Sequence, residues 1–247
     1  MRGKLLLLLA ALTLTGTLAM GKTKERFVLQ SKNYEFQDLK SSCAVEVEHS
    51  FGTIKFIDCE PGQVRVEVKV TTTETDETFI KDMRFMNPIE EVEVNKSGNK
   101  IIIENKNQRN ENGFNRSRKG KRGYSGSRRK SEKDWSVDIT VYMPAEMSIN
   151  LEAAFCDITM SENNQGERDL EVAFCDMTGG DFNLLYMESA FSNAVLGNIK
   201  EADIDASFSD IKAETIGSIS GDFAFGSFHF NNIKEKKSVS SVFTKGI

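Results

Sequence analysis

The sequence is poor in the residues that enzymes use most. Its 247 residues include only two histidines, His49 and His229, and neither has a catalytic or metal-binding constellation beside it in the sequence. It has no Ser-His-Asp set, no phosphate-binding loop, no Cys/His cluster at metal-binding spacing and no Gly-rich dinucleotide loop. These absences predict a protein that is not an enzyme and takes no cofactor, with both histidines in structural roles.

Long hydrophobic runs are also scarce, and the one that exists lies at the amino terminus. Arg2 and Lys4 precede a leucine-rich run followed by small residues, which predicts a secretory signal peptide over 1–21, cleaved after Ala19 or Gly21. A retained membrane anchor is disfavoured because the run falls short of the ~20 apolar residues needed to span a bilayer. No cysteine follows the run, which excludes a bacterial lipoprotein anchor. We therefore expect export to the periplasm or the cell surface of a bacterium, or to the medium.

The carboxyl-terminal part of the chain repeats one short motif. The segments that begin at Leu151, Leu170, Met187 and Ile204 align without a gap. Each is anchored by a phenylalanine, and looser copies continue the series. These residues are Phe155, Phe174, Phe191, Phe208, Phe225 and Phe243. A period of 17–19 residues is typical of a fold that stacks one unit on the next.

The unit itself reads as a bent β-strand. Apolar residues stand mostly four and two positions before each Phe, with an acid between them, which is the period of a strand. After the Phe come a small and a polar residue before the next apolar one, and this phase shift indicates a bend or bulge. We therefore expect a parallel β-solenoid or roll, with the Phe residues stacked ~4.8 Å apart inside its core.

The region before the repeats is predicted to be β-rich and continuous with them. Residues 27–104 contain alternating apolar and polar strands and one helix over 76–86, which ends at Asn87-Pro88. A hairpin follows over 89–103. The predicted fold class is all-β: an N-terminal β-rich region with one short helix leads into a parallel β-solenoid or roll of 17–19-residue repeats over 134–247.

Residues 105–133, here called the basic segment, differ in composition from the rest. They contain eleven Lys or Arg against Glu111 and Glu132, a net charge of +9, whereas the whole chain carries −5 and the remainder therefore −14. We expect an exposed disordered insertion that is a solvated loop without a ligand. The alternative is that it binds an acidic partner, lipopolysaccharide or acidic polysaccharide. The candidate binding residues are Arg116, Arg118, Lys119, Lys121, Arg122, Arg128, Arg129 and Lys130.

Four cysteines in an exported chain predict two disulfides, for which three connectivities are possible. Cys43 and Cys59 flank a run that is predicted to fold as a hairpin about Phe51-Gly52, which would bring them opposite each other. Cys156 and Cys175 hold the same position in adjacent repeats, one strand spacing apart. We expect these two pairings. The alternative for the second pair is that both residues merely fill a position that takes small side chains.

Acidic residues recur at two positions of the repeat. Stacked carboxylates repel one another, so they are either solvated or neutralised by Ca²⁺. The glycine- and aspartate-rich calcium repeat is absent, which favours solvation, and we predict no metal site. The residues concerned are Glu152, Glu171, Glu188 and Asp205 before the Phe, and Asp157, Asp176, Asn193 and Asp210 after it.

The repeat resembles a known family. An alternating strand, the pair Met143-Pro144, a short strand and then units of the form apolar-x-small-small-x-small-Asp-apolar are similar to the bacterial β-strand-repeat family of putative adhesins and its head-domain relatives. The resemblance covers about 43–247 and includes an early echo of the repeat at Phe51. In that family Gly usually precedes the Asp, whereas Cys or Ser does so here. The Phe column and the basic segment are further departures.

Three functions are compatible with these features. The first, which the resemblance implies, is a non-catalytic adhesin-like protein at the cell surface or in the periplasm, with a binding or structural role. The second is an envelope-stress or signalling accessory in which the basic segment docks an acidic partner. The third, a polysaccharide lyase or hydrolase, needs longer repeats and a convergent cleft that the sequence lacks. The partner is expected to be a cell-envelope component, a glycan or a protein, and not a nucleic acid, because the chain is exported.

Overall fold

A computed structural model describes residues 26–105 and 135–245. The predicted signal peptide and all of the basic segment except Asn105 lie outside the described residues. The described part is all-β with one short α-helix, as predicted. Its fourteen strands belong to one connected sheet system. No helix within these two ranges is long and apolar enough to cross a membrane.

The amino-terminal elements precede the repeats. They are β1 (Phe27–Phe36), β2 (Ala44–Asp58), β3 (Val64–Thr72), α1 (Glu77–Met86), the 3₁₀ helix η1 (Pro88–Glu91), β4 (Val92–Ser97) and β5 (Lys100–Asn105). The remaining strands are β6 (Trp135–Met143), β7 (Ser148–Thr159), β8 (Asn163–Ala173), β9 (Asp176–Gly179), β10 (Asp181–Ala190), β11 (Asn193–Leu196), β12 (Ile199–Ser207), β13 (Asp210–Ala224) and β14 (Ser227–Val242).

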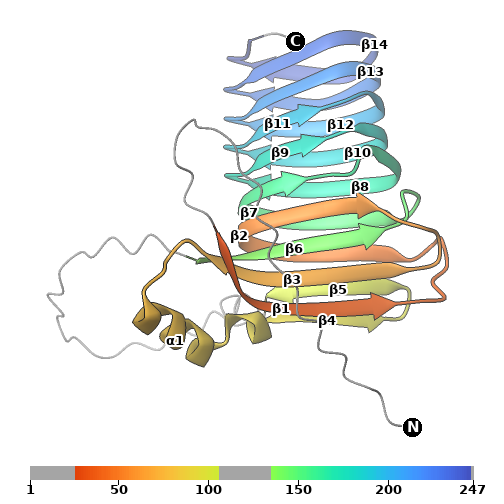
Figure 1. Ribbon diagram of the computed structural model, residues 1–247. Coiled ribbons are helices and arrows are strands. Elements are labelled where there is room, and N and C mark those ends of the chain that lie inside the picture. Colours follow the sequence, from red (N-terminus) through yellow and green to blue (C-terminus); the bar gives the residue numbers. More distant parts are fainter. Residues whose placement is uncertain (1–25, 106–134, 246–247) are drawn as a thin grey trace, which may run out of the picture.

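The repeats form a parallel roll in which each turn lies in register with the next (Figure 1). On one face β8, β10 and β12 pair in parallel, and on the other β9 pairs with β11. The long strands β7 and β13 pair on both faces, so the pairings among β7, β8, β10, β12, β13, β11 and β9 close on themselves. Buried apolar side chains of both faces fill the interior.

The strand β2 is an additional turn of this roll. Its first half pairs with β5 and β7, and its second half pairs with β6 and β7. The two halves do not pair with each other, so the hairpin predicted between Cys43 and Cys59 is wrong. The chain bends at Phe51 instead, and both halves point apolar side chains into the core, among them Val47 and Ile54.

The elements that precede the repeats, here called the amino-terminal cap, follow the predicted pattern more closely. Helix α1 starts where Asp76 accepts hydrogen bonds from the amides of Thr78 and Phe79, and it ends at Asn87 in a left-handed conformation. Strands β4 and β5 form the expected antiparallel hairpin. Through β5 on one face, and through β6, β3 and β1 on the other, the cap continues the two faces of the roll.

Each turn bends at its phenylalanine, and the ring lies on the outside. Seven phenylalanines have a positive φ of 51° to 65°. Six of their side chains are 48–51% exposed and the last is 81% exposed. The prediction that these rings lie in the core is wrong, because a left-handed residue rotates the chain so that its own side chain points outward while the residue two before it and the residue directly after it point inward. The seven are Phe51, Phe155, Phe174, Phe191, Phe208, Phe225 and Phe243.

A column of small polar side chains lies inside the same bend. In the turns of β7 to β12 the residue after each Phe is a buried Cys or Ser. The amide of Cys175 donates to Ser192 Oγ at 3.0 Å, and the amide of Ser192 donates to Ser209 Oγ at 3.2 Å. The amide of Cys156 reaches Cys175 Sγ at 3.5 Å. Each side chain therefore satisfies an amide that the bend would otherwise leave buried without a partner.

The longest repeat interval, from Phe155 to Phe174, contains a buried arginine. Arg168 is 1% exposed and donates to the carbonyls of Met147 and Ala145 and to Asn164 Oδ1. Burial lowers the pKa of this guanidinium to about 10. These hydrogen bonds connect the longer turn to the preceding one, so the charge remains well solvated by backbone dipoles.

The bend predicts different effects for two substitutions of Phe191. Phe191→Ala loses stacking with both neighbouring rings, and its side chain still makes the left-handed backbone conformation unfavourable. The free energy of unfolding should therefore fall by about 1–3 kcal/mol. Phe191→Gly loses the same contacts but removes the backbone cost, and should be about 1 kcal/mol more stable than Phe191→Ala. Urea unfolding measures both. Val195→Ala, at an exposed site off the stack, should change stability by less than about 0.5 kcal/mol. An alanine variant as stable as the glycine variant would contradict this account.

The column of small polar side chains inside the bend predicts the effects of two substitutions of Ser192. Ser192→Ala leaves the Cys175 amide buried without an acceptor, and should lower the free energy of unfolding by about 1–3 kcal/mol. Ser192→Cys keeps a weak sulfur acceptor, as at Cys175, so its free energy of unfolding should fall by less than that of Ser192→Ala. Thermal and urea unfolding of the two variants provide the comparison. Equal stability of Ser192→Ala and the wild type would show that this amide needs no partner.

Candidate functional site

The seven outward phenylalanines form one exposed stripe, here called the aromatic ridge. From Phe51 to Phe225 successive ring centroids lie 4.9–5.0 Å apart and the ring planes are within 7° of parallel. Phe243 extends the stack at 5.4 Å. Six such spacings give a ridge roughly 30 Å long. Stacking covers the ring faces, so the ridge presents an apolar row of ring edges to the solvent.

A row of carboxylates runs beside the ridge on the face formed by residues before each Phe. This acidic row contains one residue per turn and extends the predicted column by one turn at each end. Its members are Glu48, Glu152, Glu171, Glu188, Asp205 and Asp222. Neighbouring carboxylates about one strand spacing apart repel by roughly 1 kcal/mol even in water, so the row favours a positively charged partner.

Between the acidic row and the ridge the surface is hollowed. Two adjoining hollows of about 460 and 190 Å³ are lined by successive turns, and both include Glu171 and Ala173. The residue before each Phe is small, which lowers the surface there. These residues are Ser50, Ala154, Ala173, Ala190, Ser207 and Ala224. The hollows together form one shallow groove that runs along the stack from β2 to β14.

No ion pair joins the acidic row to a basic residue in the described part of the chain. The ion pairs found there join other residues, such as Lys100 with Glu46 and Lys32 with Glu90. Asp205 accepts a hydrogen bond from the amide of Asp222, which in turn accepts one from Ser240. Within 26–105 and 135–245 no group of three or more His, Cys, Asp or Glu side chains is arranged to hold a metal ion.

The two histidines lie in different environments. His229 is exposed on β14, whereas His49 is 2% exposed and lines the groove beneath its first turn. The ring of His49 contacts the Val137 carbonyl through Nε2 at 3.1 Å, and its buried Nδ1 has no hydrogen-bond partner. Burial lowers the pKa of His49 below its ordinary value, against smaller opposite effects of Val137 and Asp138. The ring is therefore neutral at pH 7.

All four cysteines are free thiols in this structure, and both predicted disulfides stay predictions. Cys156 and Cys175 are in-register neighbours, since the residues after them, Asp157 and Asp176, pair between β7 and β9. A hydrogen bond from the Cys156 thiol lowers the pKa of Cys175 to about 7, and the same contact, together with burial, raises that of Cys156. The Cys156 thiol also points toward the carbonyls of His49 and Ala154, and the Cys175 thiol toward those of Ala153 and Ala173.

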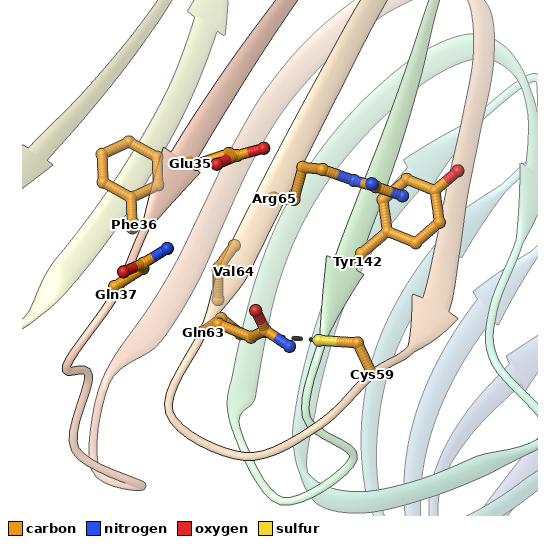
Figure 2. A pocket seen from close by; sticks show the side chains of 8 residues that line it. All are labelled: Glu35, Phe36, Gln37, Cys59, Gln63, Val64, Arg65 and Tyr142. Atoms are coloured by element: carbon orange, nitrogen blue, oxygen red, sulfur yellow. Dashed lines mark hydrogen bonds between the residues drawn. The ribbon is translucent and has the colours of Figure 1, made fainter.

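A separate cavity of about 220 Å³ lies near the ends of β1, β3 and β6 (Figure 2). Its lining includes Cys59, Glu35 and Arg65, whose guanidinium stacks 3.9 Å above the ring of Tyr142. The Cys59 thiol points toward the Gln63 carbonyl, and burial raises its pKa. A thiol that keeps its proton at neutral pH is a poor nucleophile.

The sequence interpretation placed the functional residues differently. The eight candidate residues from Arg116 to Lys130 lie outside the described residues. The aromatic ridge was recognised as a column but assigned to the core, and Arg168 was missed. The outward direction of the ring could have been predicted from the two inward positions that flank it. The apolar alternation stops at the residue two before Phe and resumes at the residue directly after it.

His49 predicts a pH dependence of stability. The unfolded state takes up a proton near pH 6.5, whereas the buried ring resists it, so the stabilisation is complete above pH 7 and declines as the pH falls through 6.5. Relative to His49→Ala, which copies Ala153 of the next turn, the wild type should lose up to about 1.4 kcal/mol per pH unit between pH 6.5 and 5. Urea unfolding at pH 7, 6 and 5 measures the difference. Parallel pH profiles of the two proteins would contradict the assignment.

No protein-family model matches the chain, and no curated protein matches its sequence. Among solved structures, a putative adhesin from Bacteroides fragilis is 11% identical, with a TM-score of 0.35 and coverage of 91% of this chain and 98% of that one. A putative adhesin from Parabacteroides distasonis is 11% identical, with a TM-score of 0.36 and coverage of 86% and 97%.

A third structure, a putative lipid binding protein from Parabacteroides distasonis, is 13% identical, with a TM-score of 0.27 and coverage of 87% and 96%. The names of the first two agree with the family that the sequence resembles. At these identities and TM-scores the matches carry no argument about fold or function, which rests on the residues of the surface itself.

Proposed function

We propose that the chain is an exported, non-catalytic binding protein of the adhesin type, built as a parallel β-solenoid of 17–19-residue repeats. It holds a cell-envelope, glycan or protein partner at the aromatic ridge and the groove beside it. The observation that carries the proposal is the ridge: six successive phenylalanine rings, each about half exposed, form a continuous apolar stripe. Contiguous apolar surface of this kind marks interaction sites in soluble proteins.

Two further features support a binding role. The groove lies open along the stack, and its polar groups are repeated at every turn, which suits an extended partner better than a small substrate. Enzymes instead gather acid, base and nucleophile at one point. The signal peptide predicted over 1–21 supports export.

A second candidate function is an envelope-stress or signalling accessory that docks an acidic partner through the basic segment. The position of the basic segment in the chain supports this second function. Asn105 ends β5 beside the first half of β2, and Trp135 begins β6 beside the second half, so the segment connects the two at the bend next to Phe51. A partner bound there would lie at one end of the ridge.

The test is binding of the purified protein to immobilised glycans, matrix proteins, and anionic and neutral lipid vesicles. The variant Phe174→Asn, Phe191→Asn and Phe208→Asn removes the apolar ridge while asparagine still accepts a left-handed backbone. It should bind at least tenfold more weakly, since buried aromatic anchors dominate interfaces. Val195→Ser, an exposed apolar site off the ridge, should bind as the wild type does.

Three outcomes would reject the proposal. The first is a wild-type protein that binds none of these surfaces, and the second is a folded triple variant that binds as tightly as the wild type. The third is turnover of an acidic glycan, which would indicate an enzyme. Loss of binding only when the basic segment is neutralised would favour the second candidate function instead.

A further inference from the structure

The surface along the stack consists of three parallel rows with one common spacing. The aromatic ridge carries one ring per turn, with successive centroids 4.9–5.0 Å apart from Phe51 to Phe225. The acidic row carries one carboxylate per turn, from Glu48 to Asp222, always three residues before the Phe. The groove lies between them, over small side chains. A partner that contacts every turn therefore needs an apolar and a cationic group at intervals of about 5 Å.

The ridge is large enough to anchor a macromolecule. Six of its rings are 48–51% exposed. Since a whole phenylalanine buries about 200 Å² when it is covered, these rings together offer roughly 600 Å² of apolar surface. That area is at the upper end of the largest apolar patches on monomeric proteins. With the floor of the groove it approaches the ~800 Å² that each partner contributes to a standard protein–protein interface.

The chemistry of the surface selects the kind of macromolecule. Stacking covers the ring faces, so flat groups find no face to lie on, whereas branched aliphatic side chains can pack against the ring edges. The carboxylates of the acidic row repel an anionic membrane. Within the two described ranges no ion pair joins this row to a basic side chain. The surface therefore favours a polypeptide that carries both aliphatic and basic side chains.

The spacing of the turns favours a helical polypeptide over an extended one. Side chains on one face of a β-strand recur every ~6.6 Å and would lose register with the ridge by more than ~1.5 Å per turn. An α-helix has a pitch of ~5.4 Å, which differs from the ridge spacing by only ~0.5 Å, and its apolar residues can form a single stripe. The acid and the Phe of one turn lie roughly 10 Å apart along the strand, which is about the diameter of a helix.

We propose that the aromatic ridge and the groove bind a basic amphipathic α-helix of a partner protein. The helix lies along the stack, with its apolar stripe against the ridge and its Lys or Arg side chains over the acidic row. About 20 helical residues cover the ridge, which is roughly 30 Å long. This inference rests on the proposed function and specifies its partner. Binding should weaken with salt, because exposed charges are screened within ~10 Å at 0.1 M ionic strength.

Binding of a designed peptide tests the helical partner. The fluorescent probe has about 20 residues, with leucine at every third or fourth position, lysine beside the leucine stripe and alanine elsewhere. One control peptide has glutamate in place of lysine. The other has the same composition, ordered so that leucine and lysine alternate as in a strand. Fluorescence anisotropy at about 50 mM salt should show at least tenfold tighter binding of the probe than of either control, and a smaller preference over the glutamate peptide at about 500 mM.

Two variants of the protein locate the peptide on the surface. The ridge variant replaces three rings and the groove variant neutralises three carboxylates of the acidic row. Both should bind the probe at least tenfold more weakly than the wild type does. The substitutions are Phe174→Asn, Phe191→Asn and Phe208→Asn in the first variant, and Glu152→Gln, Glu171→Gln and Glu188→Gln in the second.

A matched control removes the same charge elsewhere on the stack. Its three glutamates are exposed and lie six or seven residues from the nearest Phe of the ridge, so binding should stay within twofold of the wild type. Circular dichroism identifies a triple variant that loses its β structure. The single substitutions Phe191→Asn and Glu171→Gln then take its place, and each should weaken binding at least threefold. The control substitutions are Glu167→Gln, Glu201→Gln and Glu214→Gln.

Three results would overturn the inference. The first is equal binding of the helical and the alternating peptide, and the second is unchanged binding of the probe by the folded groove variant. The third is a wild-type dimer that dissociates when the three rings are replaced, because a second copy would then cover the ridge.

These results can be separated from a failure of the proposed function. If the probe does not bind, but the ridge variant still loses binding to glycans, matrix proteins or vesicles, the helical partner is wrong and the proposed function stands. If the wild type binds neither the probe nor any of these surfaces, both are wrong.

Discussion

Every turn of this protein depends on one residue that holds the backbone in the left-handed region. At that residue the chain changes face without losing its inward apolar pattern: Leu151 and Ala153 are buried before Phe155, and Cys156 and Ile158 are buried after it. The conformation is costly for a residue with a side chain. In-register stacking repeats the bend at about 5 Å, so each ring lies against its neighbours and the contacts offset the cost.

The in-register stacking of the turns also determines the surface of the roll. Because equivalent residues of successive turns are aligned, any outward position becomes a straight row, whether it is aromatic, acidic or small. The aromatic ridge, the acidic row and the groove between them thus arise from one repeat unit. A surface of this kind lengthens by one identical step with each added turn, and it presents the same chemistry over its whole length.

Charge is distributed unevenly in the chain, and the topology explains why this matters. The basic segment takes +9 into a single insertion, while the rest of the chain carries −14. Part of that negative charge lies in the acidic row, along which the carboxylates repel one another. The insertion joins the fold at the corner nearest the start of this row. The two strands that the insertion connects, β5 and β6, therefore lie beside the first turn of this row.

The sequence alone determined the repeat, its strand character and the parallel stacking, because a 17–19-residue period with an alternating apolar pattern leaves few other ways to bury the apolar face. It also determined helix α1, whose cap at Asp76 and stop at Asn87 are local signals. The turn formed by β2 was visible only as an echo at Phe51.

The tertiary structure sets the direction of each Phe side chain, since a single left-handed residue reverses the side that a strand pattern assigns to it. It alone decided that β2 bends rather than folds back as a hairpin, because its two halves find partners in β5, β6 and β7 that are remote in the sequence. The groove also belongs to the structure, as it exists only when the turns are stacked.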